Sequence, residues 1–165
     1  MTELRRVKNE EKTLLFNLLQ KYLYEMSGVY GDDIDAAGNY AYNYFDAYFT
    51  DETRKPLFII EEGAVAGFVM LNKYSFVGGE PDNMISEFCV LPKYRKAHVA
   101  RRAFELLCRE YPGKWELKYS VNNVPAAKLW NEVTKPYSPK KYELEDGEEA
   151  ICFSTEKLNS EENNA

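Results

Sequence analysis

The sequence predicts an α/β fold, of the α+β kind, in a single domain. Hydrophobic residues recur at helical spacing in four segments, and with the alternation or continuity of strands in seven others. The 165 residues suffice for one sizeable core, and 45% of them are hydrophobic and 15% aromatic, as in packed globules rather than disordered chains. We expect the domain to span residues 1–155 and a polar, disordered tail to occupy residues 156–165.

The N-terminal third is predicted to contain one strand and two helices. Residues 4–7 alternate as a short edge strand, and residues 9–26 carry leucines at helical spacing behind Asn9, a candidate N-cap. Residues 28–38 are rich in glycine and aspartate and predict a loop. Residues 40–49 hold six aromatic side chains and predict a second helix, which either forms a pocket wall or simply packs on the first helix.

Three strands are predicted in the middle of the chain. Residues 57–62 and 65–73 flank a glycine and read as a hairpin, in which Gly67 marks a bulge or a close approach of another backbone. Residues 84–91 are mostly apolar and β-rich, as in a largely buried strand. Pro92 ends this strand because it has no N–H to donate.

A cationic turn, Lys93-Tyr-Arg-Lys-Ala-His98, lies between the third of these strands and the next helix. Apolar residues on one helical face predict that helix over residues 99–110. Unpaired N–H groups at a helix N-terminus, the helix dipole and nearby basic side chains all favour an anion. The turn therefore predicts a phosphate-binding site.

The C-terminal elements follow from alternation and capping signals. Residues 115–121 alternate cleanly and predict a strand with one buried face. Asn122-Asn123 opens a further helix that tolerates Pro125 in its first turn. Residues 142–144 and 150–153 flank an acidic turn and predict a second hairpin.

The strand, turn and helix at the centre of the chain resemble the coenzyme A signature of the GNAT superfamily of N-acetyltransferases. In that family a strand ends in Val-x-Pro-x-Tyr and is followed by Arg/Gln-x-x-Gly-x-Gly/Ala and a helix. Five of the six informative positions match in Val90-Leu-Pro92-Lys-Tyr94-Arg95-Lys-Ala-His98-Val-Ala100. His98 stands where the family has its central glycine. Because glycine permits close approach or an unusual backbone conformation, we expect His98 to carry a steric cost, or the turn to hold phosphates differently.

A second signature of the family, Asn-x-x-Ala-x-x-Leu-Tyr, has its counterpart in Asn123-Val-Pro-Ala126-Ala-Lys-Leu129-Trp130. Trp130 replaces a tyrosine that often acts as general acid in the family. The order of the predicted elements is also that of the family, so the resemblance covers nearly the whole chain. It implies the GNAT fold, in which about four helices flank a central mixed, mostly antiparallel sheet of six to seven strands.

The resemblance implies an acetyl-CoA-dependent N-acetyltransferase that passes an acyl group to a primary amine by direct attack in a ternary complex. The alternative is a degenerate member that binds coenzyme A or a partner without turnover, and His98 and Trp130 motivate it. Acetyl-CoA is the implied acyl donor, and no metal is implied. The implied coenzyme-binding residues are Phe88, Cys89, Val90, Arg95, Lys96, Ala97, His98, Val99, Ala100, Arg101, Asn123, Ala126 and Trp130.

Glu87 and Tyr119 are the candidate catalytic residues. Desolvation inside an apolar strand can raise the pKa of an acid, so Glu87 is the candidate base. The alternative is that the Glu87 side chain has no catalytic role and points to solvent or meets a basic residue. Tyr119 is a candidate acid and Tyr142 an alternative to it, and the thiolate could also leave unaided. A backbone N–H near Cys89 or Val90 would donate to the thioester oxygen by resemblance.

The composition restricts the partners. A net charge of −6 argues against nucleic acid and anionic membranes, and fits a cationic or a neutral acceptor equally well. The resemblance implies a small-molecule or peptide amine as the acceptor. Asp32, Asp33 and Asp35 either attract a cation or form an ordinary solvated loop. The three cysteines, with no CxxC pair, favour free thiols and a cytoplasmic location. The protein is expected to be a monomer or a homodimer.

Overall fold

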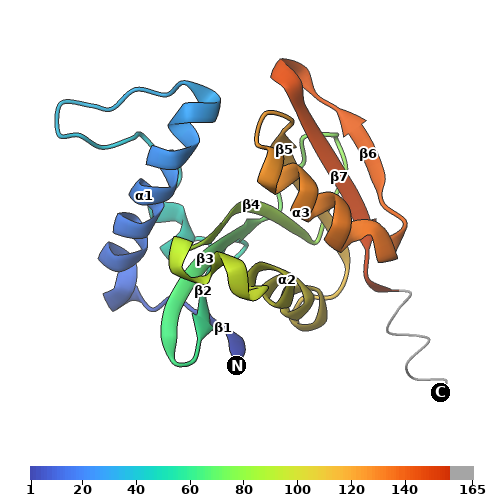
Figure 1. Ribbon diagram of the computed structural model, residues 1–165, viewed down its shortest axis with the longest axis horizontal. Coiled ribbons are helices and arrows are strands. Elements are labelled where there is room, and N and C mark those ends of the chain that lie inside the picture. Colours follow the sequence, from blue (N-terminus) through green and yellow to red (C-terminus); the bar gives the residue numbers. More distant parts are fainter. Residues whose placement is uncertain (157–165) are drawn as a thin grey trace.

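A computed structural model describes residues 1–156 and shows one seven-stranded sheet with helices on both faces (Figure 1). The predicted tail, apart from Glu156, lies outside the described residues. The strands are β1 (Thr2–Arg6), β2 (Lys55–Glu61), β3 (Ala64–Asn72), β4 (Asn83–Val90), β5 (Lys114–Ser120), β6 (Lys140–Glu143) and β7 (Glu148–Ser154). The α-helices are α1 (Lys12–Tyr30), α2 (Val99–Glu110) and α3 (Val124–Thr134), and five short 3-10 helices connect elements of this described part. Within it, no helix is both long and apolar enough to cross a membrane.

The sheet order is β1-β2-β3-β4-β5-β7-β6, and every neighbouring pair is antiparallel except β4 and β5. The parallel pairing of β4 with β5 extends over only three positions, from Asn83 opposite Trp115 to Ile85 opposite Leu117. Beyond these positions the two central strands no longer pair with each other. The expected mixed, mostly antiparallel sheet of the fold is confirmed.

Two hydrophobic cores fill the two faces of the sheet. On one face, α1 packs through Leu15 and Leu19 on side chains of β2, β3 and β4, together with Phe45 and Tyr48 from the segment that follows α1. On the other face, α2 and α3 cover a larger core that includes Phe104 and the buried residues of β5 and β7 (Figure 1). Side chains that alternate along β4 therefore reach opposite cores: Cys89 belongs to the α1 side, and Val90 to the α2 side.

A bulge interrupts β4 directly where it leaves β5. Met70 of β3 lies opposite Glu87, whereas Leu71 lies opposite Ile85, so Ser86 is an extra residue in β4. Such a bulge bends the strand and increases its twist. Ser86 and Glu87 both face the α1 side as a result. Two observations show this: the Tyr42 hydroxyl lies 3.5 Å from Ser86 Oγ, and the phenols of Tyr22 and Tyr42 hydrogen-bond Glu87.

The predicted bulge or close approach at Gly67 is confirmed on both counts. Ile59 of β2 lies opposite Gly67, whereas Ile60 lies opposite Val65, so the register of β3 shifts directly beside this glycine. A Cβ atom at Gly67 would lie 2.1 Å from the backbone oxygen of Cys89, far inside van der Waals contact. Glycine at this position thus lets β3 and the last residues of β4 approach closely.

The second helix predicted at residues 40–49 is wrong, because this segment contains only a 3-10 helix at Asp46–Phe49. Tyr44 adopts a positive φ of 67°, which no α-helix continues through. Phe45 and Tyr48 are instead buried as separate anchors of an irregular segment. The predicted end of the first helix at Met26 is also wrong: α1 continues to Tyr30 and ends at Gly31, whose φ of 75° provides the left-handed cap.

The substitution Gly67→Ala tests the close approach of β3 to β4. We expect it to lower the free energy of unfolding by about 1 to 3 kcal/mol, because the new methyl group must displace the Cys89 carbonyl. Chemical denaturation measures this loss. Gly28→Ala is the matched control: its Cβ meets no atom within 4 Å, and alanine in a helix interior should be neutral or stabilising. Equal effects of the two substitutions would contradict the constraint.

Candidate active site

A pocket of about 390 Å³ opens between β4 and β5, where the two strands separate. The C-terminal half of α1 and the start of α3 complete its walls. Of the residues predicted from the sequence, those that line it are Phe88, Cys89, Val90, Arg95, Ala100, Tyr119, Asn123, Ala126 and Trp130. The separated strands present backbone edges to this pocket that are not paired with each other, so an extended polar ligand can bind there as an additional strand would.

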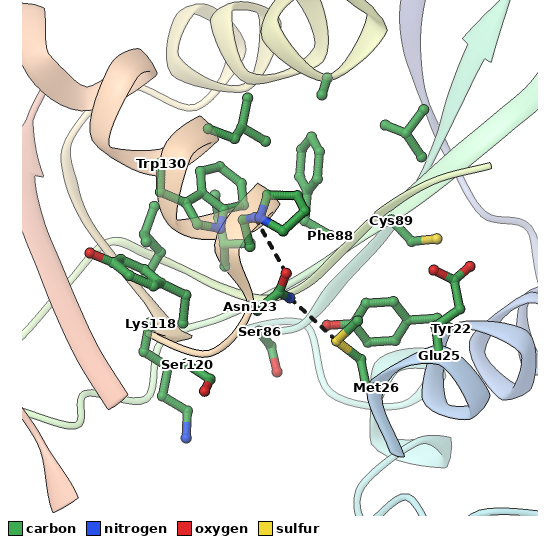
Figure 2. A pocket seen from close by; sticks show the side chains of 18 of the residues that line it. Tyr22, Glu25, Met26, Ser86, Phe88, Cys89, Lys118, Ser120, Asn123 and Trp130 are labelled. Atoms are coloured by element: carbon green, nitrogen blue, oxygen red, sulfur yellow. Dashed lines mark hydrogen bonds between the residues drawn. The ribbon is translucent and has the colours of Figure 1, made fainter. Parts of the chain in front are cut away.

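One side of the pocket is aromatic. Trp130 of α3 is only 6% exposed and packs edge-on against Phe88 of β4 and Phe104 of α2, with ring centroids 5.1 and 6.0 Å apart. Figure 2 shows Trp130 and Phe88 on the side of the cleft opposite Ser86 and Lys118. The indole is therefore part of the packed wall of the pocket.

The basic turn forms the end of the pocket near α2. Residues Pro92–Ala97 form a 3-10 helix, and His98 follows with φ 56° and ψ 22°, a left-handed conformation that is uncommon for residues other than glycine, although histidine adopts it more often than most. The steric cost expected at His98 is thus present in the backbone. His98 is the N-cap of α2, and its carbonyl accepts the N–H of Arg102 at 3.2 Å.

The remaining predicted residues of the turn do not line the pocket. The side chains of Lys96, Ala97 and His98 are exposed on the surface, and Val99 is fully buried in the core below the turn. Arg101 points to α3, where its guanidinium lies 3.6 Å from the Glu132 carboxylate. At this turn an anion could therefore bind the backbone N–H groups of the first turn of α2, around Val99, rather than these side chains.

Helix α1 contacts the surrounding loops at three points around the pocket. Glu25 forms a 2.8 Å ion pair with Arg95, whose Nε also donates to the Val90 carbonyl at 2.8 Å. Figure 2 shows Met26 beside Asn123, and the Sδ to Nδ2 distance is 3.6 Å. The Tyr30 hydroxyl hydrogen-bonds the backbone of Ser120. One face of α1 thus spans the cleft from the turn to the start of α3.

Asn123 holds the local structure at this end of the cleft. Its Oδ1 accepts the N–H of Ala126 at 3.4 Å, so it is the N-cap of α3 as the sequence predicts. The same side chain reaches Met26 through Nδ2. Asn123 therefore contacts both helices that border the pocket at this end.

Glu87 lies on the bulge, on the α1 side of the sheet, and is half-buried. Burial raises the pKa of its carboxyl to about 7, while hydrogen bonds from the Tyr22 and Tyr42 hydroxyls and the charge of Lys118 act in the opposite direction. Half of the Glu87 side chains are then ionised near neutral pH. Such a group can take up a proton and release it under ordinary conditions.

Tyr119 reaches the pocket from β5, but its hydroxyl is engaged on the far side. The hydroxyl donates to Glu149 Oε2 at 2.5 Å and accepts from Asn131 Nδ2 at 3.0 Å. Burial, and then this bond to Glu149, raise the pKa of the phenol. Its proton therefore points to Glu149 rather than into the pocket, so donation to a ligand requires this hydrogen bond to be exchanged.

Cys89 also lines the pocket, and burial raises the pKa of its thiol to about 11. A thiol with this pKa is almost entirely protonated at neutral pH and is a poor nucleophile. The three cysteines of the chain are free thiols. Within residues 1–156, no group of three or more His, Cys, Asp or Glu side chains is arranged to hold a metal ion.

The side chains that surround Glu87 and the turn were not predicted from the sequence. Tyr22, Met26 and Tyr30 continue the leucine stripe of α1 at four-residue spacing, and this spacing was the available signal. Tyr42 and Lys118 had no local signal, because their place beside Glu87 depends on an irregular loop and on the separation of two strands.

Comparisons with known proteins agree with this geometry. The sequence profile of the acetyltransferase (GNAT) family matches residues 15–133. The chain belongs to this family. The match includes α1, the turn and most of α3, so the expected family and the expected class, an acyltransferase, are confirmed. A search of the curated proteins found no match.

Solved structures share the fold of this GNAT chain at low sequence identity. Spermidine N-acetyltransferase from Vibrio cholerae in complex with CoA and spermine has a TM-score of 0.67 at 14% identity, covering 96% of this chain and 98% of that one. An acetyltransferase from Thermus thermophilus has 0.68 at 10%, covering 93% and 97%. The ribosomal-protein-S18-alanine N-acetyltransferase from Escherichia coli has 0.56 at 14%, covering 92% and 91%. These likenesses show the fold.

The GNAT family uses acetyl-CoA, and the residues of the cleft fit such a donor. The unpaired edges of β4 and β5 suit the amide groups of a pantetheine arm, and the first turn of α2 suits a pyrophosphate. The basic residues around the turn include Lys93, Arg95 and Lys96. The carboxylate of Glu25 beside Arg95 is the one acidic group paired with these residues in the described part of the chain.

The substitution His98→Gly tests the backbone strain at the turn. We expect it to raise the free energy of unfolding by up to about 1 kcal/mol, because glycine adopts positive φ without the steric cost that His98 carries. Thermal and chemical denaturation measure the change. His98→Val is the opposite control, since a β-branched residue in this conformation should destabilise the protein. A His98→Gly protein less stable than the wild type would show that the imidazole makes compensating contacts.

Proposed function

We propose that the protein is an acetyl-CoA-dependent N-acetyltransferase that acetylates a primary amine by direct transfer in a ternary complex. The observation that carries this proposal is the juxtaposition of the cleft between β4 and β5 with Glu87. The cleft ends at the N-terminus of α2 on one side. Glu87 directly follows Ser86, a residue of the pocket wall, and its carboxyl, with a pKa of about 7, suits a base at neutral pH.

The coenzyme would be held mainly by backbone groups. Those of residues 88–90 would pair with the pantetheine arm, and the N–H groups of residues 95–100 would bind the pyrophosphate. Ala100 and Ala126 are small residues at the pocket wall, and Trp130 with Phe88 forms its apolar side. Arg95 would have to exchange its ion pair with Glu25 to contact a phosphate directly.

Glu87 acts as the general base in this proposal. When bound, acetyl-CoA supplies a thioester carbonyl that is open to attack by an amine. The amine of the acceptor approaches from the α1 side of the sheet, where Ser86 and Glu87 face the space below the cleft. Glu87 takes the proton that the ammonium must lose, and the phenols of Tyr22 and Tyr42 hold its carboxylate in place.

Departure of the coenzyme thiolate requires little help from the protein. A thiol has a pKa of about 8.5, so its thiolate is a good leaving group near neutral pH. Trp130 has no proton to give, because an indole N–H does not ionise in this range. Tyr119 is the proposed donor where one is needed, once its bond to Glu149 exchanges.

The substitution Glu87→Gln tests the proposal. With a panel of primary amines, we expect it to lower kcat/KM by about a hundredfold or more, because a general base contributes roughly this much. For the wild type, kcat/KM should rise with pH and level off above about 7, since only the ionised carboxylate accepts a proton. The variant has no base at this position, so its kcat/KM should lack the step near 7 and rise only where the amine itself loses its proton. Release of free coenzyme thiol measures both.

Calorimetric titration with acetyl-CoA separates binding from turnover in the same experiment. The Glu87→Gln protein should bind acetyl-CoA as tightly as the wild type, because Glu87 does not line the pocket. Binding by the wild type without turnover of any amine would replace the enzyme with a coenzyme-binding module. Full activity of the variant would remove Glu87 from the mechanism.

A further inference from the structure

We propose that the acceptor is a primary amine that also carries a carboxylate, as a free amino acid does, and that Lys118 binds this carboxylate. This inference rests on the proposed function, because it names the acceptor class of the same site. It assigns a role to a cation that the catalytic scheme does not use. Lys118 would determine specificity, and Glu148 would position it.

Lys118 faces the same space as the bulge of β4. Ile85 lies opposite Leu117, so Ser86 and Lys118 are the next residues along two strands that separate at this point. Both lie on the pocket wall, and Figure 2 shows their polar ends on the same side of the cleft, away from Trp130. Lys118 is also the charged residue that acts on Glu87. A cation and the proposed base are thus adjacent.

The ammonium of Lys118 has two neighbours in the fold and still has N–H donors available for a ligand. Its Nζ lies 2.9 Å from Glu148 Oε2 and 4.0 Å from the centre of the Phe76 ring, and the side chain is 30% exposed. An ammonium has three N–H donors, and in the described part of the chain Glu148 is the carboxylate that forms an ion pair with it, without a hydrogen bond to Glu148 Oε2. The side chain of Glu148 is only 17% exposed, so this pair is fixed in place.

The positive charge of Lys118 determines which class of amine can bind at this site. A carboxylate on the acceptor gains charge-assisted hydrogen bonds from the free donors of Lys118 while its amine faces Glu87. A diamine or polyamine would have to place its second ammonium next to Lys118, and like charges at this distance repel. A polycation could bind only by displacing Lys118 from Glu148. The half-buried pair opposes this exchange, because Lys118 would lose its partner.

Matched acceptors and matched variants test the inference. The acceptors are α-amino acids, the corresponding α-carboxamides, which lack the negative charge, and linear diamines. The wild type should favour the amino acids. Lys118→Gln should raise KM for the amino acids about ten- to hundredfold and leave KM for the carboxamides unchanged, because a hydrogen bond to a charged group is worth this much. Lys118→Arg should retain most of the preference. Lys140→Gln, on the exposed strand β6, is the control.

A binding measurement keeps the test independent of turnover. Calorimetry with the Glu87→Gln protein saturated with coenzyme A should detect the amino acid, and the additional substitution Lys118→Gln should abolish this binding. Equal use of amino acids and carboxamides by the wild type would overturn the inference. So would a preference of the wild type for diamines over amino acids. Absence of turnover with every amine, while coenzyme A and the amino acid still bind, would overturn the proposed function and leave the Lys118 site standing.

Discussion

The separation of β4 from β5 is the constraint on which the rest of the site depends. Parallel pairing stops at Ile85 and Leu117, and the bulge at Ser86 bends β4 away directly afterwards. Gly67 allows β3 to approach the end of β4 closely, so β4 stays paired with β3 in the region where it no longer pairs with β5. One irregularity therefore opens a cleft between strands and turns Ser86 and Glu87 to the same face.

The two faces of the sheet differ in polarity at the cleft. On the α2 and α3 side, Trp130 and Phe88 make a dry wall that suits the apolar parts of a coenzyme. On the α1 side lie the polar groups, with Glu87 and the Lys118–Glu148 pair around one space. Helix α1 joins the two sides through Glu25 and Met26, which contact the turn and Asn123. In the proposed function, this one helix would border both the coenzyme and the acceptor.

Local patterns were sufficient for much of this architecture. The strand before Pro92, the cationic turn and the cap at Asn123 depend on neighbouring residues, and all three are found where the sequence predicts them. The segment at residues 40–49 was mispredicted because Phe45 and Tyr48 are fixed by tertiary burial rather than by helical spacing. The surroundings of Glu87 were also beyond prediction, because the bulge depends on the register with β3 and Lys118 belongs to a different strand, β5, far along the chain.

The most direct test of the central claim is a titration of the ¹⁵N-labelled protein with coenzyme A, followed through the backbone amide resonances. If the cleft between β4 and β5 is the coenzyme site, the resonances of residues 86–90 and 95–101 should shift together and saturate, with smaller changes along the end of α1. Shifts confined to the outer groove between α1 and residues 34–40, or none at millimolar coenzyme A, would contradict the account.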